Sequence, residues 1–157
     1  MLGPLVNPSS PQNLMLGTFN LEIARLYNYI LQDEKSQYGI IHGLDGYDEI
    51  SLTSGFKLFT KSGEQLINPE DNGLERISQS EIYGGNSVED AAKIFKNIIE
   101  GKGTKAQNSV VLANAAYALK IIDKNLTFEE AYNTAEGSLL GGKASQCLHK
   151  LITNCSS

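Results

Sequence analysis

The chain has 157 residues, of which 41% are hydrophobic and 20% are charged, and its formal net charge is -5. This length and composition suit one globular domain with a buried core. The lysines and arginines are scattered, so we expect no nucleic-acid partner, because such proteins gather basic residues to neutralise phosphates. No apolar run approaches the ~20 residues of a membrane-spanning helix. No signal peptide is recognisable either, so we expect no membrane partner and a cytoplasmic location.

The first half of the chain is expected to alternate between helix and strand. Residues 3–11 contain three prolines, which predict an ordered loop. A helical apolar pattern over residues 20–32 follows Asn20, a good N-cap. Residues 37–42 are mostly apolar and predict a strand that ends at a glycine-rich turn. Residues 56–60 and 64–67, which flank Lys61-Ser62-Gly63, predict a β-hairpin.

The second half is expected to be largely helical. Residues 68–81 are typical of a loop, and Ser87 caps an amphipathic helix that ends at Gly101. Residues 107–122 are apolar almost all round, which predicts a buried helix. A capping box over residues 127–130 begins a last helix that we expect to run to about residue 153. Gly141 and Gly142 inside that helix indicate a kink or a tight packing contact.

These elements predict an α/β protein with at least four helices and at least three strands. The strand candidates are too few for a complete central sheet. We therefore expect the C-terminal part of a mixed central sheet flanked by helices, in a fold truncated at its N-terminal side. Unpaired strand edges and uncovered apolar faces favour self-association. Cys147 and Cys155 have neither a disulfide nor a metal-binding spacing, and we expect both to be free thiols.

The segment with the clearest chemical potential follows the strand predicted at residues 37–42. Ligands of open α/β sheets bind beyond the carboxyl ends of strands, and Asp48 and Glu49 lie on such a loop. Two adjacent carboxylates there could hold Mg2+, and the alternative is a solvated acidic turn. His42, at the end of the strand, is expected to be packed and hydrogen-bonded.

The proline-stiffened opening is a second candidate. The backbone from Gly3 to Pro8 could line a pocket for a flat apolar ligand, and the alternative is a structural connector. The residues alone therefore lead to an α/β chain with a possible Mg2+ loop.

Several motifs then resemble one family, the anthranilate phosphoribosyltransferases. LGPLVNP at residues 2–8, followed by LMLG at 14–17, is similar to the family's LGPLxNP…xLG segment. HG at residues 42–43 with GYDEIS at 46–51 is similar to its HGxxGxDEIS segment. Further matches are NS-ED-A at residues 86–91, NAA at 114–116 and GKA at 142–144. Their order and spacing cover nearly the whole chain.

The resemblance implies a glycosyltransferase reaction of tryptophan biosynthesis. Anthranilate attacks C1 of the ribose of phosphoribosyl pyrophosphate, diphosphate leaves, and Mg2+ assists as cofactor. By position, Asp48 and Glu49 would be the metal carboxylates, and Gly3 and Pro4 would border the anthranilate site. His42 would support the loop. No catalytic residue is assigned.

Other family segments do not occur in residues 1–157: the GTGGD diphosphate loop, the KHGN segment, and an arginine shortly before LGPLxNP. Residues 1–157 would thus form the C-terminal part of the α/β phosphoribosyltransferase domain, without the helical N-terminal domain, and would be inactive alone. The expected assembly is a homo-oligomer or a complex with a complementing N-terminal part. Two alternatives remain: a non-catalytic binding or regulatory remnant, and an unrelated enzyme using Asp48, Glu49 and His42 as acid/base groups.

Overall fold

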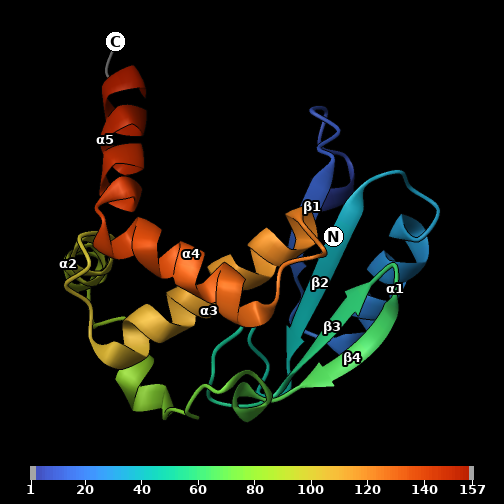
Figure 1. Cartoon of the computed structure of the whole chain (residues 1–157), viewed down its shortest axis with the longest axis horizontal. Coiled ribbons are helices and arrows are strands. Elements are labelled where there is room, and N and C mark those ends of the chain that lie inside the picture. Colours follow the sequence, from blue (N-terminus) through green and yellow to red (C-terminus); the bar gives the residue numbers. More distant parts are fainter. Residues whose placement is uncertain (1–2, 156–157) are drawn as a thin grey trace.

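The computed structural model describes residues 3–155, and its centre is a sheet of four strands in the order β1-β2-β3-β4 (Figure 1). Strand β1 (Asn13–Gly17) pairs in parallel with β2 (Gln37–Gly43). Strands β3 (Phe56–Thr60) and β4 (Gly63–Ile67) continue the sheet in antiparallel order. The sheet is therefore mixed, as expected, and the predicted hairpin is confirmed. Within the described residues, β1 and β4 are its edges.

Helix α1 (Leu21–Leu31) connects the two parallel strands. It begins where predicted, because the Asn20 side chain accepts a hydrogen bond of 2.8 Å from the backbone N–H of Ile23. Its buried residues, Ala24, Tyr27 and Leu31, pack against Ile40 and Phe59 and their neighbours in the sheet. This contact covers one face of the sheet.

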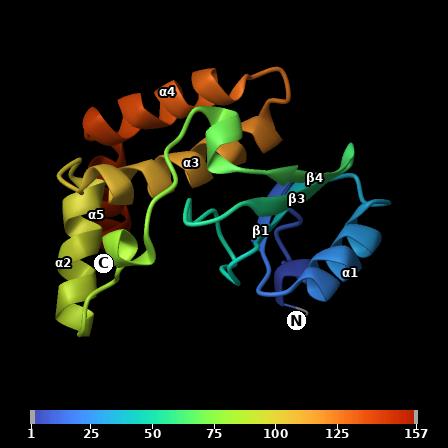
Figure 2. The ribbon, with the colours of Figure 1, turned by 90° about the horizontal axis from the view of Figure 1, so that it is seen from below.

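The other face is covered by α3 (Lys105–Ile122), whose Ala113 and Tyr117 pack against β2 and β3 residues (Figure 2). The prediction of a helix here is confirmed, although it begins two residues earlier, where a capping box at Thr104 satisfies the first N–H groups. The prediction that it is buried all round is wrong. Val111 and Ile122 are exposed, because only the side toward the sheet and α4 is covered.

The long C-terminal helix expected from the sequence is two helices, α4 (Phe128–Leu140) and α5 (Lys143–Cys155). The break comes at Gly142, whose φ of 73° lies in the left-handed region that glycine adopts most readily. The kink alternative is therefore confirmed and the continuous helix is wrong. Helix α4 packs on α3, whereas α5 extends away from the body of the molecule (Figure 1).

Helix α2 (Val88–Ile99) begins after its predicted N-cap, Ser87, which accepts a hydrogen bond from the Asp90 N–H. Its amphipathic pattern is clear, but none of its twelve residues is buried. Val88 is 81% exposed and Phe95 is 50% exposed. The pattern predicted the helix correctly, and within residues 3–155 its apolar face is only partly covered.

Residues 3–155 also contain three short 3-10 helices, at Gly3–Leu5, Pro69–Asn72 and Gln79–Ile82. The first lies within the opening segment that was predicted as a loop. Cys147 and Cys155 are free and exposed, as expected. None of the helices in residues 3–155 is long and apolar enough to cross a membrane.

Candidate functional site

The predicted metal carboxylates lie on the loop of residues 44–55 between β2 and β3, which we call the carboxylate loop. Asp48 and Glu49 are both exposed on it. The loop follows the end of β2, and β1 ends beside it, because Gly17 pairs with Ile41. This is the edge of a parallel strand pair at which α/β proteins place ligands.

The carboxylate loop offers a partial rather than a complete set of metal ligands. No group of three or more His, Cys, Asp or Glu side chains suited to a metal ion occurs within residues 3–155. Mg2+ usually takes one or two carboxylates and completes its shell with substrate phosphates and waters. The exposed pair Asp48 and Glu49 fits that kind of site, in which a phosphorylated ligand supplies other oxygens.

Strand β1 approaches the loop so closely that only glycine fits at its last position. A Cβ placed on Gly17 would lie 1.7 Å from the carbonyl oxygen of Asp48. Real Cβ contacts are never that short, so the backbone of Asp48 rests directly on the end of β1. In the sequence, Gly17 stands out only as part of a motif, because nothing local shows which residue it touches.

The first turn of the loop is fixed by the end of β2. The Gly43 N–H donates a 2.8 Å hydrogen bond to the carbonyl oxygen of Tyr47. A Cβ on Gly43 would lie 2.9 Å from that same oxygen. The His42 side chain contacts the residue that follows β1, since its Nδ1 lies 2.9 Å from the carbonyl oxygen of Thr18. This bond is consistent with the expected role of His42 in supporting the loop.

Asp45 organises the second half of the loop. Its Oδ2 accepts hydrogen bonds from the hydroxyls of Ser51, at 3.0 Å, and Thr53. Its Oδ1 is buried without a hydrogen-bond partner. These bonds tie the loop's beginning to its end, across six and eight residues. Sequence reasoning missed this role, although an Asp followed by hydroxyl residues is typical of such turns.

Glu49 also lines a small cavity of about 170 Å3. Its other walls come from the loop, from Ile82 and from α2 and α3, and they are mostly apolar: Tyr47, Ser51, Ile82, Ile94, Ile98, Gln107, Val110 and Val111. The cavity therefore joins the carboxylate loop to α2. Glu49 borders this cavity and remains exposed.

The other predicted substrate residues lie in the opening segment. Gly3 begins the first 3-10 helix and is exposed, with no heavy atom within 4 Å of a Cβ placed on it. Its backbone is therefore open to a ligand. Pro4 occupies the middle of that helix, and its side chain lies outside the described part of the structure.

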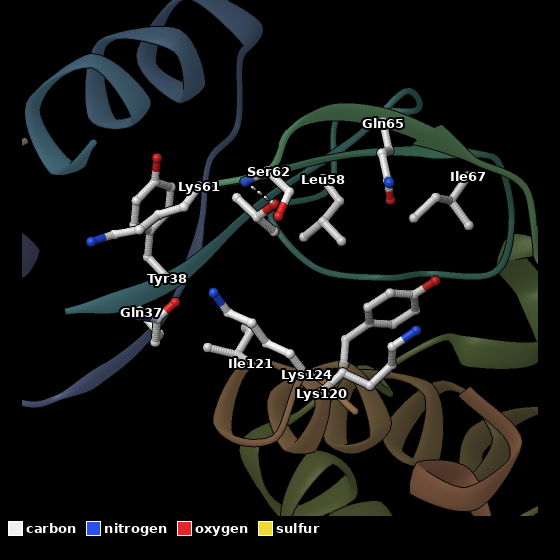
Figure 3. Close-up of a pocket in the computed structure, with 12 residues that line it drawn as sticks. Gln37, Tyr38, Leu58, Lys61, Ser62, Gln65, Ile67, Lys120, Ile121 and Lys124 are labelled. Carbon is white, nitrogen blue, oxygen red and sulfur yellow. Dashed lines mark hydrogen bonds between the residues drawn. The ribbon is translucent and has the colours of Figure 1, made fainter. Parts of the chain in front are cut away.

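A larger groove, of about 270 Å3, lies between the sheet and α3 (Figure 3). Leu58 and Ile67 line it on the sheet side, and Ile121, Lys120 and Lys124 on the α3 side. Tyr117 of α3 also lines it. It is bordered by Gln37, the first residue of β2, whereas the carboxylate loop follows the last. The groove also extends along the sheet toward that loop, because its lining residue Ile67 is in register with Phe56, which pairs with Gly43 at the end of β2.

Comparison with known proteins shows the family to which the chain belongs. A family model described as the a/b domain of a glycosyl transferase family matches residues 1–145. The chain therefore belongs to this glycosyl transferase family. Anthranilate phosphoribosyltransferase of Flavobacterium johnsoniae is 51% identical over 151 residues, which are 96% of this chain and 46% of that protein. The Cytophaga hutchinsonii enzyme of the same name is 49% identical over 97% of this chain and 46% of its own length.

Solved structures show the same fold. Anthranilate phosphoribosyltransferase from Saccharomyces cerevisiae, in complex with PRPP and Mg, matches with a TM-score of 0.87 and 24% identity. The match covers 99% of this chain and 45% of that one. The enzyme from Thermus thermophilus has the same score and identity, with 99% and 47% covered. The expected fold class is thus confirmed, and the chain spans slightly less than half the length of its relatives.

Proposed function

We propose that this chain is the C-terminal part of an anthranilate phosphoribosyltransferase, which transfers phosphoribose from phosphoribosyl pyrophosphate to anthranilate in tryptophan biosynthesis. The observation that carries the proposal is the 51% identity to such an enzyme over 96% of the chain. The carboxylate loop lies where a phosphorylated ligand of an α/β sheet is expected. The cytoplasmic location stays a prediction.

The proposed reaction is a substitution at the sugar. The amino nitrogen of anthranilate forms a bond to C1 of the ribose, and the bond from C1 to the diphosphate oxygen breaks. Diphosphate leaves with that electron pair, and the nitrogen loses a proton. Substitution at an anomeric carbon passes through a transition state resembling an oxocarbenium ion. The protein therefore contributes mainly by positioning the reactants and by stabilising the charge that develops on the leaving group.

In this proposal, Asp48 and Glu49 would hold Mg2+. When bound, Mg2+ would neutralise charge on the departing oxygens. The open backbone at Gly3, together with Pro4, borders the flat ring of anthranilate.

The remaining binding groups would come from outside these 157 residues. The GTGGD and KHGN segments of the family do not occur in the sequence. A complementing N-terminal part would bring them to the carboxylate loop and pair with the free edge of β1. A homo-oligomer of this chain alone could cover its exposed apolar surfaces but would not supply those segments.

The test is anthranilate consumption, followed by its fluorescence, with phosphoribosyl pyrophosphate and Mg2+. The chain is assayed alone and with a separately produced N-terminal portion of a relative. We expect activity only in the mixture. Asp48→Ala with Glu49→Ala should then abolish it. Asp33→Ala with Glu34→Ala is the matched control, because these adjacent exposed acidic residues lie after α1, before β2 begins.

Each outcome has a clear meaning. Activity of the chain alone would show that other residues replace the missing segments. Activity of the mixture that survives loss of Asp48 and Glu49 would refute their metal role. Absence of anthranilate consumption in the mixture, with both parts folded, would favour the alternative of a non-catalytic remnant. The intact Asp48–Glu49 pair is the feature that speaks against that alternative.

A further inference from the structure

Asn114 lies in the middle of α3, a position where asparagine is less favourable than alanine. Its side chain is nevertheless fully used. Oδ1 accepts a 3.1 Å hydrogen bond from the N–H of Ile50, and Nδ2 donates a 2.8 Å hydrogen bond to the carbonyl oxygen of Ile50. A further bond of 2.9 Å runs from Nδ2 to the carbonyl oxygen of Val110 in the preceding helical turn. One side chain thus pairs with both backbone groups of a residue 64 positions away.

Ile50 follows Glu49 directly, so this pairing fixes the backbone next to both carboxylates. The Ile50 side chain is 1% exposed and belongs to the core cluster that contains Tyr117 of α3. Its backbone and its side chain are therefore both attached to the α3 side of the molecule. On the other side, the carbonyl oxygen of Asp48 rests on Gly17.

The dipeptide Asp48–Glu49 is consequently held at two fixed points, one on β1 and one on α3. Consecutive Cα atoms lie about 3.8 Å apart, so the short backbone between the two anchors has little room to reorient. We propose that Asn114 is the positioning residue that sets the direction of the Asp48 and Glu49 carboxylates. The proposal rests on the proposed function of these carboxylates as metal ligands.

The expected effect follows from comparable sites. Partners that orient the ligands of a metal without touching it typically contribute about 10-fold to 100-fold to metal affinity. Replacing Asn114 by alanine leaves the N–H and carbonyl oxygen of Ile50 without their partner. The loop then opens more often, and the two carboxylates converge on a cation less often. We expect metal binding to weaken at least ~10-fold while the carboxylates themselves are unchanged.

The experiment uses this chain and two readouts. The first is amide hydrogen exchange of residues 48–52 without metal. The second is a titration with Mn2+, a paramagnetic substitute for Mg2+, followed by broadening of the same amide signals in NMR. Asn114→Ala is compared with Asn108→Ala. Asn108 is the matched control, because it lies on the same helix and its side chain also bonds to a backbone carbonyl, that of Gly103.

We expect Asn114→Ala to accelerate exchange at Ile50 and to raise the Mn2+ concentration for half broadening at least ~10-fold. Asn108→Ala should change neither. If Asn114→Ala unfolds, Asn114→Gln takes its place. Asn114→Gln keeps the same polar groups but moves them by one methylene. We expect it too to accelerate exchange at Ile50 and to raise the Mn2+ concentration for half broadening.

Faster exchange at Ile50 with an unchanged Mn2+ midpoint would overturn the positioning role, since Asn114 would then serve the fold alone. Absence of broadening in the unmodified chain would overturn the metal function and the positioning role together. The two failures are distinguishable, because in the first the unmodified chain still binds Mn2+.

Discussion

Gly17 offers a direct test of how the carboxylate loop is placed. A Cβ at this position would lie 1.7 Å from the carbonyl oxygen of Asp48, whereas ordinary contact begins at 3.4 Å. Gly17→Ala therefore requires Asp48 or the end of β1 to move by about 1.7 Å. The obstacle is backbone, which cannot rotate away as the end of a long side chain can. The displacement falls on the residue proposed to hold the metal.

A misplacement of about 1 Å can reduce catalysis roughly 100-fold. We therefore expect Gly17→Ala to reduce the activity of the complemented enzyme at least ~100-fold. Overpacking of this kind also lowers the free energy of unfolding by about 1–3 kcal/mol. The assays are anthranilate consumption in the mixture with the N-terminal portion and urea unfolding of the chain followed by circular dichroism.

Gly137→Ala is the matched control, because it makes the same chemical change at an exposed position in the last turn of α4. No heavy atom beyond the neighbouring helix backbone lies within 4 Å of a Cβ placed there. Alanine is favoured over glycine in a helix, so this variant should be more stable by about 0.5–1 kcal/mol and fully active. Full activity and unchanged stability of Gly17→Ala would show that the loop does not depend on its contact with β1.

Three further predictions concern the rest of the molecule. Burial raises the pKa of Tyr117 and Tyr38 above the usual value near 10. The unfolded chain then loses these protons first, so the free energy of unfolding should fall as pH rises above about 10, and Tyr117→Phe should flatten that decline in urea titrations. Gly142→Ala should cost about 1 kcal/mol in the same measurement, because φ is 73° there; unchanged stability would contradict the strain. Light scattering should give a mass above the 17.1 kDa of one chain, because exposed apolar residues favour self-association. Val88 and Leu151 are 81% and 60% exposed, so replacing both by lysine should lower the measured mass. A monomer mass for the unsubstituted chain would refute self-association.

Local signals allowed most of the fold to be predicted. The Asn20 cap, the turn at Lys61–Gly63 and the Ser87 cap each act within a few residues, and the structure has all three features where expected. Strand β1 was missed because its five residues, NLMLG, show no alternation of polar and apolar side chains. Its extended form is stabilised by pairing with β2, at residues 24 positions further along the chain.

The same distinction applies to the site. Asp48 and Glu49 could be predicted because the residues after a strand lie at a known edge of the sheet. Gly17 and Asn114 could not, because their contacts with the loop depend on how β1 and α3 pack. Asn114 acts across 64 positions, and no spacing rule reveals such a partner. The same limit applies to α2. Its amphipathic pattern predicts that one face is covered but does not show which surface covers it.

The supports of the carboxylate loop all lie within this chain, and this bears on whether a separate N-terminal part can restore activity. The loop is held by backbone contacts and hydrogen bonds within this chain, made by Gly17, Gly43, Asp45 and Asn114. The loop can therefore adopt its conformation before the diphosphate-binding segments arrive. Complementation then requires only that two folded surfaces associate. Activity of the mixture should accordingly rise with the concentration of either part and saturate. Amide hydrogen exchange at residues 48–52 of the chain alone that is as fast as in the urea-unfolded chain would show that the loop is not organised in advance.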